Sequence, residues 1–124
     1  MTLSPSLPMA GPWTVLGLMS GTSADGADEA MIQVDPGGFA RRNPFLAFLG
    51  HHHEPYPDAL REAVLAAAGD RLKPSELCVL QTRLGAHHAR TARQLADNLG
   101  LAPQLASLHG QTVQHWPDQN ATLQ

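Results

Sequence analysis

Residues 17–31 read GLMSGTSADGADEAM and bring glycines, hydroxyls and carboxylates together between apolar flanks. Backbone N–H groups of glycine can converge on an anion because no Cβ blocks the approach, and the hydroxyls of Thr22 and Ser23 add donors to phosphate oxygens. Asp25 and Asp28 would repel a bare phosphate, so they fit a phosphate whose charge is screened by a cation such as Mg²⁺. The residue types in this stretch are therefore suited to binding a phosphate group.

The same loop also fits an ordinary hairpin in which Asp25-Gly26 supplies the positive-φ turn. It is not a P-loop, because no Gly-Lys-Ser/Thr follows the glycines, and it lacks the GxGxxG spacing that opens a helix. The loop alone leaves the phosphate-binding and hairpin interpretations open.

The elements around the loop are predicted from the spacing of apolar residues. Residues 13–19 and 27–34 are apolar and β-branched and read as two adjacent strands joined by the loop. Pro and Gly at 35–38 favour a tight turn, and 44–56 reads as a third strand. These segments predict a three-stranded meander.

Two helices and a further strand follow the meander. Residues 57–69 are rich in Ala and Leu and stop at a glycine, and a second helix opens at Ser75 and ends at Gly100. Residues 103–110 return to an extended pattern, so the chain is predicted to be α/β. The apolar stripe of the second helix, predicted to be core, comprises Leu77, Leu80, Leu84, His88, Thr91, Leu95 and Leu99.

Composition narrows the class of protein. The chain has 124 residues, 43% of them hydrophobic and 15% charged, which allows one modest core. A net charge of −3 with 8 thinly spread Lys and Arg residues leaves no basic patch for nucleic acid. No apolar run reaches the length of a membrane span, and the single Cys78 fits a reducing, cytoplasmic compartment. Residues 1–12 are expected to be a loose extension.

Two groups of histidines could suggest metal binding but also fit ordinary structural roles. Residues 51–53 are three consecutive histidines, but neighbouring side chains of a strand point to opposite faces, so the three rings cannot converge on one metal ion. We expect a solvated strand end there. His88 lies on the apolar stripe of the second helix beside His87 and is expected to be a packing histidine with its hydrogen bonds satisfied.

Three separated motifs together resemble the N-terminal part of the anhydro-N-acetylmuramic acid kinases. They are GLMSGTSADGAD at 17–28, SLHGQTVQHWP from Ser107, and TLQ at 122–124. In that family a Met-Ser-Gly-Thr-Ser-x-Asp-Gly-x-Asp loop follows the first strand, and His-Gly-Gln-Thr, a Pro and Thr-Leu-Gln come later in the same order. Agreement of separated motifs is more specific than either alone, and it favours the phosphate-binding interpretation of the loop.

The resemblance implies a fold and a reaction. The fold is that of the actin-like ATPases and sugar kinases, with two RNase-H-like lobes and a cleft between them, and residues 13–124 would form an incomplete N-terminal lobe. The family uses ATP, with Mg²⁺, and water to open the 1,6-anhydro ring and phosphorylate O6, which gives N-acetylmuramic acid 6-phosphate. This phosphotransferase reaction belongs to peptidoglycan recycling and amino-sugar catabolism in the cytoplasm. Small molecules are the implied partners, and a homodimer is compatible with the resemblance.

The resemblance also implies the roles of particular residues. The HGQT segment would lie beside the sugar, and the water-activating aspartate, the adenosine site and the second lobe would lie further along the family's sequence, so no catalytic residue is expected here and the chain alone is expected to be inactive. No residue is assigned to a metal. The residues expected to face the ATP phosphates are Gly21, Thr22, Ser23, Ala24, Asp25, Gly26, Ala27 and Asp28, and those expected beside the sugar are His109, Gly110, Gln111 and Thr112.

Departures from the family pattern keep other functions open. Ala24 and Ala27 replace larger apolar residues, and Gln114 stands where the family often has Trp, which bears on the shape of the sugar pocket. A non-catalytic sugar- or phosphate-binding module and a kinase for another sugar are the alternatives. Within the loop, we expect Asp25 to face the phosphates and Asp28 to brace the turn by accepting backbone N–H bonds.

Overall fold

The structure is a computed structural model that describes residues 11–123. The expected extension over 1–12 falls mostly on residues outside this range. The described elements, in chain order, are β1 (Trp13–Ser20), β2 (Gly26–Val34), the 3₁₀ turn η1 (Pro36–Gly38), β3 (Phe45–Pro55), α1 (Asp58–Ala68), α2 (Pro74–Leu99), β4 (Leu105–Gln111), β5 (Gln114–Trp116), the 3₁₀ turn η2 (Pro117–Gln119) and β6 (Ala121–Leu123).

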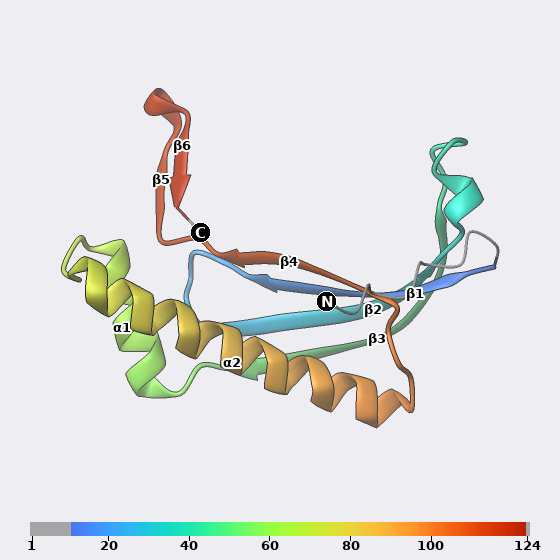
Figure 1. Cartoon of the computed structure of the whole chain (residues 1–124), viewed down its shortest axis with the longest axis horizontal. Helices are drawn as coiled ribbons and strands as arrows, with labels where there is room; N and C mark the ends of the chain where they lie inside the picture. The colour runs from blue at the N-terminus through green and yellow to red at the C-terminus, as the bar shows by residue number, and fades with distance from the viewer. Residues whose placement is uncertain (1–10, 124) are drawn as a thin grey trace, which may run out of the picture.

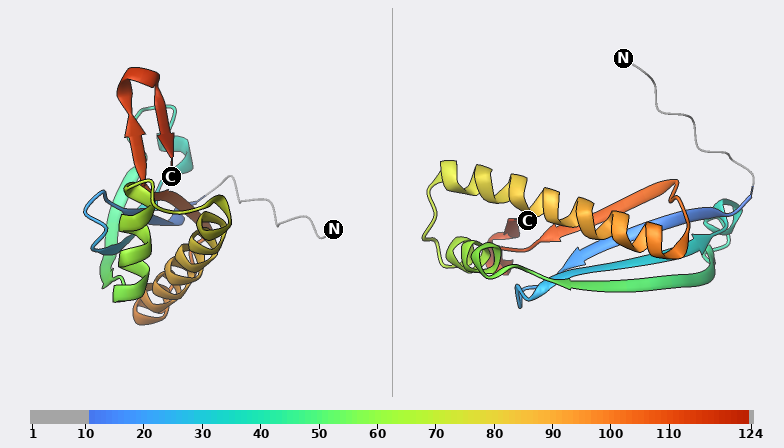
Figure 2. Two further views of the ribbon diagram at one scale, coloured as in Figure 1. Left: turned by 90° about the vertical axis from the view of Figure 1, so that its left-hand side faces the viewer. Right: turned by 90° about the horizontal axis from the view of Figure 1, so that it is seen from below.

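A four-stranded sheet in the order β3-β2-β1-β4 forms the centre of the protein. β1, β2 and β3 are an antiparallel meander, whereas β4 runs parallel to β1, with Leu18 opposite Leu108. The parallel pairing requires a long crossover, and α1 and α2 provide it. Both helices lie on one face of the sheet, and α2 runs along it (Figures 1 and 2). The predicted α/β order of meander, helices and further strand is confirmed.

The helices bury the faces that their sequences predict. In α1, Leu60, Val64 and Ala67 are buried and pack with Tyr56 and Leu80. The stripe along α2 also faces the protein, and its C-terminal part packs on β1 and β2 in a second apolar cluster. That second cluster consists of Leu16, Leu18, Met31 and Leu95. Gly100 ends α2 in the left-handed conformation, with φ of 63°, as its position predicts.

Two connections differ from the prediction. The turn at 35–38 is a 3₁₀ turn inside a longer connection that reaches Phe45, because Asp35 caps it by accepting the Gly37 N–H and also pairs with Arg41. β5 and β6 form a separate two-stranded hairpin that the pattern of apolar residues does not predict. The hairpin and the 35–44 connection project from opposite ends of the sheet, away from the helices (Figure 1). Among the described helices, neither has the length and apolar character needed to cross a bilayer.

Candidate functional site

The Gly-rich loop, residues 21–25, connects the end of β1 to the start of β2. Its turn is closed by the Ala24 N–H, which donates to the Gly21 carbonyl at 3.3 Å. Ala24 is the residue with positive φ, 52°, so the alternative hairpin in which Asp25-Gly26 supplies the positive φ is wrong. The methyl group of Ala24 is 1% exposed and packs in the apolar cluster against α1, which compensates for the unfavourable backbone angle.

The outer side of the loop is open and polar. Thr22, Ser23 and Asp25 are exposed, and a Cβ added to Gly21 would meet only Ser23 Oγ, at 3.6 Å. Ser23 Oγ donates to Asp25 Oδ1 at 2.8 Å, and this hydrogen bond is the main cause that lowers the pKa of Asp25. The loop therefore offers hydroxyl and backbone donors beside an ionised carboxylate, a donor set that fits a phosphate group accompanied by a divalent cation.

Two further residues of the predicted set, Gly26 and Ala27, are inside the fold. A Cβ on Gly26 would collide with the Glu54 carbonyl and lie 2.9 Å from Pro55 Cα, so glycine is needed there for the close approach of β3. Ala27 is 0% exposed and packs against α1. Neither the Ala24 nor the Ala27 side chain reaches the open side of the loop.

Asp28 lies on the face of the sheet opposite the helices, because Ala27 and Glu29 on either side of it point towards them. Its Oδ1 contacts His51 Nε2 at 3.1 Å and His53 Nδ1 at 3.0 Å. The expectation that Asp28 braces the turn through backbone N–H groups is therefore wrong: the strand begins before Asp28 and carries its side chain away from the loop.

The alternation of β3 also separates the three consecutive histidines. His52 points to the other face, where its Nε2 lies 3.4 Å from Glu54 Oε2. Within residues 11–123, no group of three or more His, Cys, Asp or Glu side chains has an arrangement that could hold a metal ion.

The HGQT segment at the end of β4 comes next to the loop, as Ser20 pairs with Gln111 across β1 and β4. His109 is exposed and lines an open cavity of about 910 Å³ together with Asp28, His51, Met19 and Ser107. Gly110 has φ of 86°, a backbone angle that favours glycine, and it turns the next side chain inward. The two motifs that are separated in sequence are thus adjacent in space.

Gln111 is the centre of a buried hydrogen-bond network. Its Nε2 donates to the Gly21 carbonyl at 2.8 Å and to the Thr112 carbonyl at 3.0 Å. Its Oε1 lies 2.6 Å from Ser20 Oγ and 3.2 Å from the Tyr56 hydroxyl. The two carbonyls on one side and the two hydroxyls on the other determine which end of the amide is nitrogen.

Tyr56 anchors this network to α1. Its hydroxyl donates to Ser20 Oγ at 2.8 Å, its N–H donates to the Asp25 carbonyl at 3.1 Å, and its ring packs edge-on against His87 at 5.0 Å between centroids. Burial raises the pKa of the Tyr56 phenol, so the group stays protonated and available as a donor.

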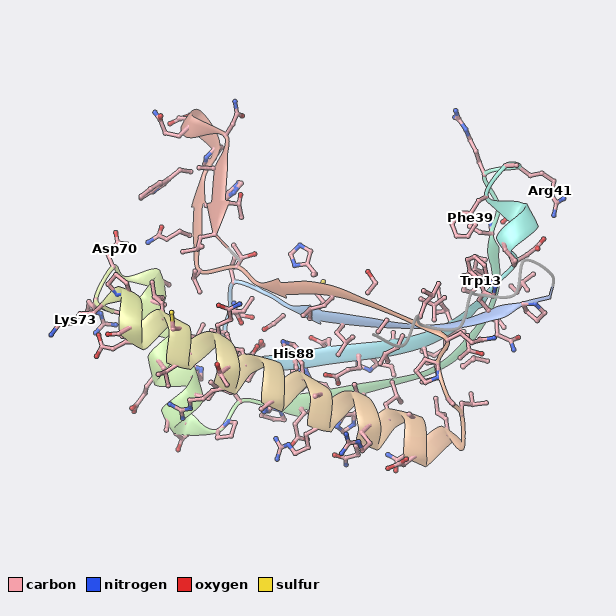
Figure 3. The ribbon with its side chains drawn as sticks, viewed as in Figure 1. Trp13, Phe39, Arg41, Asp70, Lys73 and His88 are labelled. Atoms are coloured by element: carbon pink, nitrogen blue, oxygen red, sulfur yellow. The ribbon has the colours of Figure 1, made fainter. Side chains whose placement is uncertain are left out.

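A second buried polar cluster lies between α2 and the sheet, and His88 belongs to it (Figure 3). Glu29 accepts a hydrogen bond from Thr91, and His88 Nδ1 lies 3.9 Å from Glu29 Oε1. Neither ring nitrogen of His88 has a hydrogen-bond partner among the described residues, so the expectation of a satisfied histidine is wrong. The ring instead borders an apolar cavity lined by Leu80, Leu84 and other residues, and burial lowers its pKa and favours the neutral form.

Sequence reasoning missed Ser20, Tyr56 and Glu29. A signal for two of them was present, since Ser20 follows Leu16 and Leu18 at the inward positions of β1, and Glu29 stands between inward Ala27 and Met31. Tyr56 carried no such signal, because it lies in the connection after β3.

The antiparallel meander, the parallel β4, the helices on one face and the small-residue loop after β1 together define the N-terminal part of a sugar-kinase lobe. The sequence model of the anhydro-N-acetylmuramic acid kinase family matches residues 13–124, and the chain belongs to this family.

Relatives named anhydro-N-acetylmuramic acid kinase support this membership. The chain is 45% identical over 102 residues to the kinase from Acidithiobacillus ferrooxidans. The aligned region covers 82% of this chain and 24% of that protein. The chain is 37% identical over 117 residues to the one from Rhizobium etli, covering 90% and 31% respectively, and 39% identical over 104 residues to the one from Picosynechococcus, covering 83% and 26%. The chain therefore spans between about a quarter and a third of the length of these relatives.

Proposed function

We propose that this chain supplies the phosphate-binding part of an ATP-dependent kinase that acts on anhydro-N-acetylmuramic acid. In this reaction the bond between C1 and O6 breaks, the oxygen of water bonds to C1, and O6 takes the γ-phosphoryl group. The products are N-acetylmuramic acid 6-phosphate, ADP and a proton. The observation that carries the proposal is the open, donor-rich loop at 21–25 held against the HGQT segment in a member of this family.

The chain's own residues would bind and orient the triphosphate. Exposed Thr22 supplies a hydroxyl donor, and the Ser23 hydroxyl, which donates to Asp25 in the free protein, would turn to the phosphate when it binds. The absence of a side chain at Gly21 leaves room for phosphate oxygens. Mg²⁺ supplies the positive charge that screens the phosphates from Asp25. Positioning and electrostatic stabilisation account for most of the catalysis of phosphoryl transfer, and these are the tasks that such a loop performs.

The sugar would bind beside the loop. His109 and Gly110 belong to the last residues of β4, and Thr112 follows the strand. Of the three, His109 lines the open cavity on the outer face of the sheet. The single Cys78 fits a reducing compartment, and the proposed reaction would take place in the cytoplasm, in peptidoglycan recycling and amino-sugar catabolism.

The test uses the full-length protein that carries these residues. Purified protein is mixed with ATP, Mg²⁺ and anhydro-N-acetylmuramic acid, ADP release is followed, and the sugar product is identified by its mass. We expect ADP release that depends on the sugar and a product heavier by one water and one phosphoryl group. Binding of ATP without turnover would support the non-catalytic module instead, and turnover of other sugars alone would identify a different kinase.

A further inference from the structure

We infer that Gln111 is a positioning residue that holds the phosphate-binding loop, and that it is not a ligand of the sugar. The inference rests on the proposed function for the identity of the phosphate ligand. It revises one member of the segment expected beside the sugar, and it links the two sequence motifs through one side chain.

The hydrogen-bonding capacity of Gln111 is already used inside the protein. A glutamine amide has two N–H donors and an oxygen with two lone pairs. The donors go to the carbonyls of Gly21 and Thr112, and the oxygen faces the hydroxyls of Ser20 and Tyr56. With 4% of its surface exposed, Gln111 has no polar group left to offer a sugar hydroxyl.

The bond to Gly21 has a geometric consequence for the loop. In a trans peptide the C=O of one residue and the N–H of the next point in opposite directions. Gln111 holds the Gly21 carbonyl towards the protein interior, so the N–H of Thr22 is directed to the opposite, open side of the loop. Without this bond, the Gly21 carbonyl keeps only the 3.3 Å bond from the Ala24 N–H, and no Cβ at Gly21 restricts rotation of the peptide.

The other end of the amide is held by two hydroxyls. Ser20 Oγ lies 2.6 Å from Gln111 Oε1 and also 2.6 Å from the Gly26 carbonyl. The Tyr56 hydroxyl lies 2.8 Å from Ser20 Oγ and 3.2 Å from Gln111 Oε1, so the two hydroxyl protons are shared among these acceptors. Ser20 is 1% exposed and Tyr56 5% exposed, so water does not compete for these bonds. The loop is therefore pre-organised before any ligand arrives, and this reduces the entropy that binding must overcome.

The test is Gln111→Glu in the full-length protein. Glutamate has the same shape and keeps an acceptor for Ser20 and Tyr56, but it offers two oxygens in place of the donors that face Gly21 and Thr112. We expect the Kd and KM for ATP to rise about tenfold, the cost of roughly one or two hydrogen bonds, while the KM for the sugar changes less than about twofold. If Gln111 were instead a ligand of the sugar, the KM for the sugar would rise and the KM for ATP would change little.

Control variants distinguish this positioning role from a nonspecific loss of stability. Gln33→Glu makes the same chemical change in β2, where Gln33 pairs with Thr14 and Ala47, and should leave both constants unchanged. Tyr56→Phe removes a donor on the oxygen side only and should have a smaller effect on ATP than Gln111→Glu. If Gln111→Glu does not fold, Gln111→Met keeps the length without a charge and is measured in its place.

A ligand-free measurement distinguishes failure of this inference from failure of the proposed function. Hydrogen–deuterium exchange of the loop amides at 21–25 should be faster in the Gln111 variant than in the parent protein, while exchange along α2 stays the same. Unchanged loop exchange, or a raised sugar KM with unchanged ATP binding, would overturn the inference. Faster loop exchange in a protein that binds no ATP would instead leave the positioning role standing and overturn the proposed function.

Discussion

Thr91 of α2 donates a hydrogen bond of 2.5 Å to the carboxylate of Glu29 in β2, and both side chains are 0% exposed. The two residues are 62 positions apart in the sequence. Their bond connects the long helix to the central strand inside the protein, where an unpaired polar group would be costly. Glu29 is the fourth residue of β2, so this bond supports the strand that begins at the end of the Gly-rich loop.

Thr91→Val should lower the free energy of unfolding by about 1–3 kcal/mol, because it leaves the Glu29 carboxylate buried without its donor. Urea unfolding of the full-length protein, followed by circular dichroism, measures the change. Thr91→Ser keeps the hydroxyl and should recover most of the loss. Equal stability of the Val variant and the parent would show that the bond adds nothing.

The stability of the protein should depend on pH through Glu29. Burial raises the pKa of this carboxyl group, and the Thr91 hydrogen bond and the charge of His52 act against that rise. Because the folded-state pKa lies above the unfolded value, the contribution to stability is fully present below the unfolded pKa of about 4.5. It is lost as the pH rises through the folded pKa.

Glu29→Gln removes this titration, so the stability of the variant relative to the parent should increase as the pH is raised above about 4.5. Asp28 and Glu54 also raise the pKa of Glu29, and His88 lies beside it. Burial lowers the pKa of His88, which gives stability above the unfolded histidine value of about 6.5 that is lost as the pH falls. Burial of His88 is the same in both proteins, so the difference between their melts from pH 4 to 8 reports the Glu29 carboxylate together with its effect on His88. Parallel curves would contradict the prediction.

Gly21→Val should raise the KM for ATP and lower turnover without changing stability. A Cβ at Gly21 meets only Ser23 Oγ, at 3.6 Å, in the free protein, but the valine side chain would occupy the open side where phosphate oxygens are expected. Gly26→Ala should lower the stability and leave the ATP kinetics unchanged. Its Cβ would lie 2.9 Å from Pro55 Cα and strain the pairing of β2 with β3. Steady-state kinetics and thermal melts on both variants test this, and unchanged ATP kinetics in Gly21→Val would contradict the loop assignment.

Asp25→Asn should lower turnover and leave the melting temperature nearly unchanged. The exposed carboxylate bonds only within its own loop, with the Ser23 hydroxyl and with the backbone of Asp25 and Gly26, and we expect its charge to act at the phosphate site. Asp28→Asn should change stability by less than about 1 kcal/mol, since the side chain is 38% exposed and its contacts with His51 and His53 are at the surface. Thermal melts and kinetics distinguish the two variants. A large loss of stability in Asp28→Asn would restore a bracing role for that residue.

The elements of this protein follow from local sequence properties. Apolar, β-branched runs predict the strands of the meander. The three- to four-residue spacing of His88, Thr91 and Leu95 predicts the buried face of α2. Gly100 ends that helix because glycine adopts the left-handed conformation with little strain. The order of the Gly-rich and HGQT motifs along the chain is sufficient to indicate the family.

Only the tertiary structure determined which polar side chains meet. Gln111 and Gly21 are 90 positions apart, and their hydrogen bond exists because the crossover through α1 and α2 makes β4 parallel to β1. Asp28 contacts His51 and His53 because β3 pairs with β2 in a particular register. A shift of one residue would move the side chains of β3 to the opposite face of the sheet. Spacing along a chain determines the face on which a side chain lies, but its partner depends on strand pairing and on the packing of distant elements.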